Sequence, residues 1–245
     1  MKDRKLTAKL AVVFGGSRGI GAAIARRLAR EGADVALTYI SAPDKAADTV
    51  RAIETEGCAG LAIRADSADA AAIRNAVAKA VHRFGRLDIV VVNAGILRVH
   101  DLQDFSLRDL DLMLDVNVRG VFLGIQAAAA HLSQGGRIIT IGSNAAVRSG
   151  YPGSSVYSMT KAAVAVMVKG IAVDLAPRGI TVNNIQPGPT RTDMAAEHLD
   201  MLTPMIPLKR VAEPEEIAGL VAYLASSESG YMTGSSLTID GGLAL

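Results

Sequence analysis

The chain of 245 residues contains few of the residues that support disulfides, metal clusters and aromatic cores. It has a single cysteine, Cys58, four histidines without close spacing and no tryptophan, and only 4% of its residues are aromatic. One cysteine excludes an internal disulfide, and the histidines offer no zinc-like cluster. We therefore expect a metal-free protein of a reducing compartment. Because half of the residues are hydrophobic, the core must consist of Ala, Val, Ile and Leu, which suits close packing of helices on a sheet.

The chain also lacks a linker, a block of like charges and a long apolar run near its start. No Pro/Ser-rich or low-complexity tract divides it, so we expect one domain over residues 1–245. The net charge is +2 with scattered basic residues, which argues against nucleic acid as the main partner. The apolar run Leu10 to Phe14 is too short for a signal peptide or a membrane span. We expect a cytoplasmic protein without a membrane partner.

Seven short β-branched runs alternate with longer segments of helical period. The intervals leave room for the crossover helices that parallel strands require. We therefore expect an α/β fold of the Rossmann type, a doubly wound, seven-stranded parallel sheet with helices on both faces. The expected strands are Leu10–Phe14, Val35–Tyr39, Gly60–Ile63, Ile89–Val92, Arg137–Ile141, Thr181–Ile185 and Ser236–Ile239.

A glycine-rich loop follows the first strand directly, and a helix is expected after it from Ala22 to Arg30. Glycines in such a loop permit a tight turn, close approach of the backbone to a diphosphate and close packing of helix on strand. The helix N-terminus also faces the anion. This position between strand and helix predicts a dinucleotide site much more strongly than a glycine-rich loop alone. The expected contacts are Gly15, Ser17, Arg18, Gly19, Ile20 and Gly21.

The end of the second strand favours NADP(H). An NAD-binding fold usually places an acid there for the ribose 2′-hydroxyl, but this chain has Tyr39. Arg18 in the glycine loop and Ser41 after the strand are able to receive a 2′-phosphate. NAD(H) stays open because Asp44 is near in sequence, and Arg18 has the alternative interpretation of a solvated loop residue.

Small and polar residues follow three further strands. Asp66-Ser67 stands where an adenine amino group could be met, or else caps the helix Ala70–Phe84. Asn93-Ala94-Gly95 allows the cofactor's ribose to approach the backbone. Pro187-Gly188-Pro189-Thr190 forms a rigid turn at the same edge. The segment of about 190–207 has poor periodicity, and we expect it to form a mobile lid over the substrate.

The stretch Tyr157-Ser158-Met159-Thr160-Lys161 places a phenol and an ammonium one helical turn apart. We expect the lysine charge to lower the pKa of the phenol from about 10, so that the tyrosine can act as an acid near neutral pH. The bare spacing is also typical of a solvated helix face. The strongly apolar run Ala162–Val168 that follows indicates burial instead.

Two other polar residues are candidates for the same site. Ser143 follows the fifth strand at the end where open α/β sheets bind ligands. It is either a loop or capping residue or, opposite Tyr157, a donor to a substrate carbonyl oxygen. Asn117 lies in the apolar helical stretch from Ser106 to His131, either as a satisfied core amide or as a relay that holds a water beside Lys161.

These residues resemble the short-chain dehydrogenase/reductase family over essentially the whole chain. In that family the tyrosine is the general acid/base, the lysine lowers its pKa and binds the nicotinamide ribose, the serine orients the carbonyl, and the asparagine supports a proton relay. The resemblance implies these roles for the matching residues here. The matching motifs are Gly15-x-x-x-Gly19-x-Gly21, Asn93-Ala94-Gly95, Asn117, Ser143, Tyr157-x-x-x-Lys161 and Pro187-Gly188.

Three features depart from the family's pattern. Phe14 replaces a threonine before the glycine loop, and Val92 replaces a second asparagine before Asn93. We interpret both as apolar packing in place of a hydrogen bond between neighbouring strand ends. The interval from Ser143 to Tyr157 is also one residue longer than is commonest.

The nearest subgroup is the 3-oxoacyl-carrier-protein reductases and the carbonyl reductases related to them. This resemblance implies reversible, NADPH-dependent reduction of a ketone or aldehyde to an alcohol. A carrier-bound acyl chain is the alternative substrate. The enzymes that use one typically have basic residues near the mouth of the active site, and the one just before the fifth strand is absent here, so that Arg178 near the sixth strand remains as a candidate. The expected substrate contacts are Ser143, Ala145, Tyr151 and Tyr157.

Two rival functions belong to other classes: a non-catalytic nucleotide-binding regulator and a purely structural subunit. The segments Val121–Ala130 and Ala162–Val173 are apolar around more than one face. We expect these two helices to meet copies of themselves in a dimer or a homotetramer, as in the resembling family.

Overall fold

The computed structural model describes residues 4–196 and 199–245 and contains one seven-stranded parallel sheet in the order β3-β2-β1-β4-β5-β6-β7. The predicted α/β fold is confirmed. The strand order reverses between β1 and β4, and sheets of this kind bind ligands at such a switch point. Three strands extend one or two residues beyond their expected ranges. The strands are β1 Leu10–Phe14, β2 Asp34–Tyr39, β3 Gly60–Arg64, β4 Ile89–Val92, β5 Arg137–Ile141, β6 Thr181–Pro187 and β7 Ser236–Ile239.

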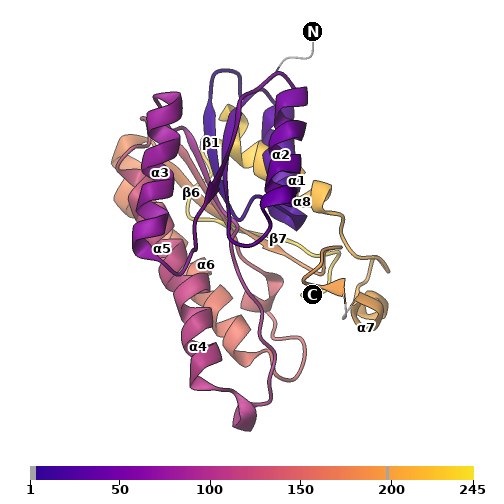
Figure 1. Ribbon diagram of the computed structural model, residues 1–245. Helices are drawn as coiled ribbons and strands as arrows, with labels where there is room; N and C mark the ends of the chain where they lie inside the picture. Colours follow the sequence, from indigo (N-terminus) through magenta and orange to yellow (C-terminus); the bar gives the residue numbers. More distant parts are fainter. Residues whose placement is uncertain (1–3, 197–198) are drawn as a thin grey trace.

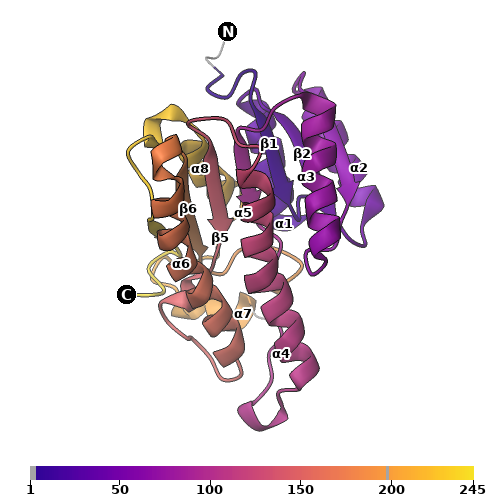
Figure 2. The same ribbon diagram turned by 90° about the vertical axis from the view of Figure 1, so that its left-hand side faces the viewer.

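Helices cover both faces of the sheet (Figures 1 and 2). α1, α2 and α8 lie on one face, and α3, α5 and α6 lie on the other. α4, α7 and the first turns of α6 project beyond the carboxyl ends of the strands, at the lower end of both views. The helices are α1 Gly19–Arg30, α2 Pro43–Thr55, α3 Ala70–Phe84, α4 Leu107–Leu114, α5 Gly120–Ala129, α6 Ser155–Leu175, α7 Leu199–Leu202 and α8 Pro214–Ala225.

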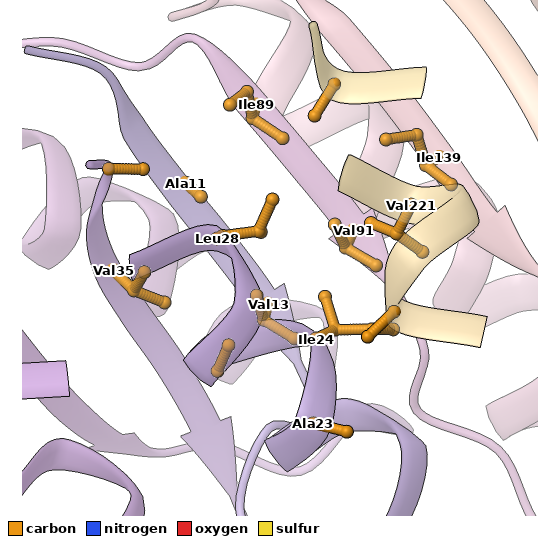
Figure 3. Close-up of a cluster of buried hydrophobic side chains, with 14 of the residues drawn as sticks. Ala11, Val13, Ala23, Ile24, Leu28, Val35, Ile89, Val91, Ile139 and Val221 are labelled. Carbon is orange, nitrogen blue, oxygen red and sulfur yellow. The ribbon is translucent and has the colours of Figure 1, made fainter. Parts of the chain in front are cut away.

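Each face of the sheet buries its own cluster of small aliphatic side chains. Ala11 and Val13 of β1 face the α1 and α8 layer, where Figure 3 shows Leu28 and Val221 packed over the sheet. The alternate residues of β1 face the opposite cluster, because successive side chains of a strand point to opposite faces. A central strand with both faces covered is therefore apolar throughout, as its sequence is.

Two helices begin at residues other than the expected ones. α1 begins at Gly19 rather than Ala22, because the amide of Ala22 already donates to the carbonyl of Arg18. α3 is capped by Asp69, whose carboxylate accepts hydrogen bonds from the amides of Ala71 and Ala72. The interpretation of Asp66-Ser67 as the cap of this helix is wrong, since Asp66 instead closes a turn with the amide of Ala68.

The expected helix from Ser106 to His131 has a wide turn in its middle. Ser106 caps the start, and the helical segment ends at Ala129. Between α4 and α5, Asp115–Arg119 forms a π-helical turn in which the amide after it bonds to the carbonyl of Asp115, five residues back. Turns of this type occur often at functional sites. Here the turn carries Asn117.

Phe14 packs between β1 and α5. Its side chain is 2% exposed, and its ring lies 3.6 Å from the Cβ position of Gly124. This is an ordinary van der Waals distance, so the ring reaches α5 and fills space that a smaller residue would leave. This arrangement supports the interpretation of Phe14 as a packing residue.

Replacing Phe14 with threonine should lower the free energy of unfolding by about 2 to 4 kcal/mol, because the change leaves a cavity and buries a hydroxyl beside apolar neighbours. Thermal unfolding followed by circular dichroism measures the effect. An unchanged melting temperature would contradict the packing role of the ring.

Candidate active site

The glycine loop forms a cradle at the carboxyl end of β1. Gly15 has a φ of +73°, and a Cβ there would lie 3.0 Å from the Cα of Ala94. A Cβ on Gly21 would lie 2.0 Å from the carbonyl oxygen of Gly15. Only glycine permits this close approach of loop, helix α1 and the Asn93-Ala94-Gly95 turn. The space kept free of side chains, with the helix N-terminus pointing at it, fits the diphosphate of a dinucleotide.

Two side chains hold this cradle to the neighbouring strands. The Gly15 amide donates to Thr38 Oγ1 over 3.0 Å, and Asn93 Nδ2 donates to the Gly15 carbonyl over 2.9 Å. These bonds tie the loop to β2 and to the turn after β4. Thr38 was missed from the sequence, although a threonine in an otherwise apolar buried strand is a signal of such a role.

The residues expected around the adenosine end lie along the same edge of the sheet. Tyr39 is the last residue of β2 and is half-buried, so no carboxylate stands at that position. Ser17 is buried, whereas Arg18 and Ser41 are exposed. Arg18 and Ser41 are thus free to face an anionic group. Ile20 is half-buried in the first turn of α1.

Tyr157 and Ser143 meet at the carboxyl end of β5. Tyr157 lies in the first turn of α6, and its hydroxyl is hydrogen-bonded to Ser143. Ser143 is buried and accepts a bond from the amide of Ala145 over 3.1 Å. Since this bond occupies a lone pair of the serine oxygen, the hydroxyl hydrogen is free to donate toward the phenol. The two hydroxyls predicted from the sequence are therefore brought together.

Lys161 lies one turn further along α6 and is 6% exposed. Its Nζ donates to the carbonyl of Ile141 over 3.1 Å and stands 5.6 Å from the ring centroid of Tyr157. It also lies 3.5 Å from the Cβ position of Gly95. Burial lowers the pKa of Lys161 to about 8. The ammonium thus lies between the turn at Gly95 and the ring of Tyr157.

The predicted direction of the tyrosine pKa is wrong for this structure. Although Tyr157 as a whole keeps some exposure, its hydroxyl is enclosed by protein, and this burial raises the pKa of Tyr157 to about 12 against the lowering effect of Ser143. The ammonium of Lys161 is directed at the Ile141 carbonyl, so it does not offset the loss of solvation. Tyr157 is consequently protonated throughout the neutral range.

The side chain of Asn117 is fully engaged within the core. Its Oδ1 accepts from the amide of Ile96 over 2.9 Å, and its Nδ2 donates to the Ile96 carbonyl and to Thr160 Oγ1. These bonds support the interpretation as a satisfied core amide. Its Oδ1 lies 3.4 Å from the Cβ position of Gly95, the same point that Lys161 approaches. A relay at this position stays a prediction.

The remaining predicted contacts border the same space. Tyr151 is half-buried and close enough to Tyr157 to raise its pKa further. Ala145 follows Ser143 in a short 3-10 turn. Thr190 is buried and closes the turn after β6 by donating to the Gly188 carbonyl over 3.0 Å. Pro187, the last residue of β6, leads into that turn.

The predicted lid is more regular than its sequence suggested. It contains α7 and a 3-10 turn at Thr203–Met205, and residues 197 and 198 lie outside the described residues. Its first part borders an open hollow of about 430 Å³. This hollow is lined by Arg191, Thr192, Asp193, Ala196, Leu199 and Asp200.

Arg178 is not available to a carrier-bound substrate. Its guanidinium donates to the carbonyls of Ala129 and Leu132 over 2.7 and 2.5 Å, which closes the end of α5. It precedes β6 and therefore lies at the opposite end of that strand from Tyr157. The sequence could not show this engagement.

Known proteins resemble the chain over nearly its whole length. Residues 15–244 match the family model described as Enoyl-(Acyl carrier protein) reductase. The cyclic-di-GMP-binding biofilm dispersal mediator protein of Escherichia coli K12 is 40% identical over 96% of this chain and 97% of its own length. Versicolorin reductase 1 of Aspergillus parasiticus is 36% identical over 98% of both chains.

Solved structures superimpose closely as well. A short-chain dehydrogenase/reductase from Serratia marcescens is 52% identical with a TM-score of 0.96, covering 98% of this chain and 100% of that one. A short chain dehydrogenase from Burkholderia cenocepacia, determined in complex with NADP, is 48% identical with a TM-score of 0.96 and the same coverage.

Proposed function

Because the chain belongs to the short-chain dehydrogenase/reductase family and is an oxidoreductase of that family, we propose that it reduces the carbonyl group of a small ketone or aldehyde with NADPH. The observation that carries this proposal is the Tyr157 hydroxyl hydrogen-bonded to Ser143 beside buried Lys161. A phenol held protonated next to a second hydroxyl is suited to give a proton to an oxygen that becomes negative.

Ser143, Tyr157 and Lys161 have different roles in the proposed reduction. Ser143 donates a hydrogen bond to the substrate carbonyl oxygen and so fixes its position against Tyr157. Tyr157 transfers its proton to that oxygen as negative charge develops on it. When bound, NADPH supplies the hydride that the carbonyl carbon receives. Lys161 places a positive charge 5.6 Å from the ring centroid of Tyr157, and this charge attracts the phenolate left after proton transfer without outweighing the burial that keeps the phenol protonated before it.

The cofactor proposal depends on the adenosine end of the cradle. With Tyr39 at the end of β2, no carboxylate repels a 2′-phosphate there, and the exposed Arg18 is able to pair with one. The relative from Burkholderia cenocepacia was solved with NADP, which supports the same choice. NAD(H) is the alternative cofactor.

A diffusible carbonyl compound is the substrate class that we propose. The chain has no basic residue just before β5, and Arg178 is engaged in closing α5. The description of the family model keeps carrier-bound acyl substrates as the second candidate.

A steady-state screen tests both substrate classes. NADPH and NADH are each offered with ketones, diketones, quinones and acyl thioesters, and nucleotide absorbance is followed. Reduction of a diffusible carbonyl compound with preference for NADPH is expected. No consumption of either nucleotide across the panel would contradict the enzyme proposal, and consumption with thioesters alone would favour the carrier-bound class.

A nucleotide-binding regulator is the rival function of another class, and the Escherichia coli relative that binds cyclic-di-GMP is the reason to test it. Calorimetric titration of the protein with cyclic-di-GMP decides whether the cradle accepts a second kind of dinucleotide. Tight binding without any turnover in the screen would favour the regulator, whereas turnover without such binding would exclude it.

The pH dependence of the reduction should report on Lys161. Its pKa of about 8 and that of Tyr157 of about 12 mean that both groups are protonated at pH 7 and that only the lysine loses its proton by pH 10. We expect kcat/KM for ketone reduction to be constant from pH 6 to about 7.5 and to fall above about 8. Alcohol oxidation should instead rise with pH, because it needs the unprotonated phenol. A reduction profile that stays flat through pH 10 would contradict a role for the lysine charge.

The outer faces of α5 and α6 are proposed as subunit contacts. Two helical stretches, 107–129 and 155–178, have the length and the apolar composition of a membrane-spanning helix. Val164 and Val168 of α6 are buried against the sheet, whereas Val166 and Val173 are 67% and 74% exposed. We propose that copies of the chain cover these exposed faces in a dimer or tetramer of a cytoplasmic protein.

Introducing a charge on that face should break the assembly. Val166→Glu with Val173→Glu is expected to reduce the mass measured by light scattering to that of a smaller species. Ala47→Glu, at an exposed position on α2, is the matched control and should leave the mass unchanged. A monomeric wild-type protein would remove the proposal.

A further inference from the structure

A carboxylate from the lid forms an ion pair with a lysine near the expected cofactor-binding region. Asp193 Oδ2 is 2.9 Å from Nζ of Lys45, which is 148 residues earlier in the chain. The hydrogen bond and charge of Lys45, with a further contribution from the charge of Arg18, hold the pKa of Asp193 below its usual range. The carboxylate therefore pairs with a lysine of α2 and lies within electrostatic range of Arg18, the residue just before α1.

Lys45 follows β2 and Arg18 follows β1, so both cations belong to the carboxyl edge of these two neighbouring strands. Lys45 is the third residue of α2, and only a short loop separates this helix from Tyr39 at the end of β2. Arg18 precedes Gly19 in the glycine loop. In folds of this type the adenosine ribose lies between these two places, next to the residue that ends the second strand.

The lid crosses this region in direct contact with the glycine loop. The methyl carbon of Thr192 lies 3.2 Å from the Cβ position of Gly19. The preceding residue is fixed at the base of the lid, because the Arg191 amide donates to the Ala212 carbonyl and its side chain pairs with Glu213 over 2.8 Å. Asp193 thus lies two residues after the anchored Arg191, and its carboxylate is directed to Lys45.

We propose that the Asp193 carboxylate takes the place of the 2′-phosphate of the cofactor between Lys45 and Arg18, and that Lys45 and Asp193 together set the preference for a 2′-phosphorylated dinucleotide. This inference rests on the NADPH proposal and adds two residues to it. A phosphate monoester carries a charge of about −1.5 to −2 at neutral pH and three acceptor oxygens, so it pairs with both cations more strongly than one carboxylate does. Binding of the phosphate then releases Asp193 from Lys45.

The two residues should have opposite effects that are specific to the 2′-phosphate. Asp193→Asn removes the competing anion, so the Kd for NADPH should decrease about 2- to 5-fold, while the Kd for NADH changes by less than about 2-fold. Lys45→Gln removes a cation and should raise the Kd for NADPH about 3- to 10-fold without a matching change for NADH. In the double variant the gain from Asp193→Asn should shrink, because one of the two cations it competes for is gone.

Isothermal titration calorimetry with adenosine 2′,5′-bisphosphate and with 5′-AMP measures these effects without turnover, and nucleotide fluorescence gives the values for NADPH and NADH. Asp200→Asn is the matched control, since Asp200 lines the same hollow of the lid, and it should leave all four ligands unaffected. Raising the salt concentration should diminish every difference, because the groups are exposed.

The possible failures can be told apart. A wild-type protein that binds adenosine 2′,5′-bisphosphate no better than 5′-AMP would overturn the NADPH proposal and this inference with it. A wild-type preference for the bisphosphate that Asp193→Asn leaves unchanged, or an equal change for both ligands, would overturn only the role of Asp193. An unchanged preference in Lys45→Gln would do the same for Lys45.

Discussion

Replacing Tyr157 with phenylalanine is expected to lower kcat for carbonyl reduction by at least about 100-fold, because the variant keeps the ring and loses the hydroxyl that is bonded to Ser143 and supplies the proton in the proposed reaction. The Kd for NADPH should stay within about 2-fold, since the ring still fills its place in α6. Stopped-flow or steady-state absorbance gives the rate, and nucleotide fluorescence gives the affinity. Tyr223→Phe, on α8, is the matched control and should retain full activity.

Two outcomes would contradict this assignment. Near-normal turnover of Tyr157→Phe would mean that another group delivers the proton, and Tyr151, which lies close to Tyr157, would be the first to examine. Loss of nucleotide binding together with turnover would make the tyrosine a structural residue of the cradle.

Gly21→Ala is expected to remove most nucleotide binding and to destabilise the protein. The added Cβ would lie 2.0 Å from the Gly15 carbonyl oxygen and 2.6 Å from Asn93 Nδ2, so the loop must move and the bond between these two groups must break. We expect the Kd for NADPH to rise more than about 10-fold and the free energy of unfolding to fall by about 2 to 4 kcal/mol. Calorimetric titration and denaturant unfolding measure the two effects.

A second glycine-to-alanine change separates this clash from a general effect of the substitution. Gly219 lies inside α8, and its Cβ position has only the end of the Arg27 side chain nearby, at 3.6 Å. Gly219→Ala should be neutral or slightly stabilising, because alanine is the better helix former. Equal behaviour of the two variants would show that the cradle tolerates a side chain at Gly21.

Much of the fold and the meeting of the candidate site residues could be predicted from the sequence. The strands are short β-branched runs bounded by glycines or polar residues, so four of the seven ranges agree in full with the structure. Ser143, Tyr157 and Lys161 could be placed at one edge of the sheet, because the carboxyl ends of parallel strands, and the starts of the helices that follow them, lie at the same edge.

The features that sequence reasoning missed depend on contacts between distant residues or on the direction of single side chains. The spacing of apolar residues does not distinguish an α-helical hydrogen bond to the fourth preceding residue from a π-helical one to the fifth. The π turn at Asp115–Arg119 could therefore not be predicted. The pKa of Tyr157 depends on the depth of its hydroxyl and on the bond from Lys161 to the Ile141 carbonyl. The pairing of Lys45 with Asp193 joins segments that no local pattern relates.

The bond from Asn93 to the Gly15 carbonyl spans 78 residues of the chain, and this fixes the order in which the cradle can be assembled. Until β4 has docked beside β1, the loop has neither this bond nor the backbone of Ala94 against which it turns. A chain that ends before β4 is therefore not expected to bind a dinucleotide, even when β1 and α1 have already formed. Conversely, a bound dinucleotide should protect the β1–β4 pair most strongly against amide hydrogen exchange, because separation of these strands destroys the surface to which the dinucleotide binds.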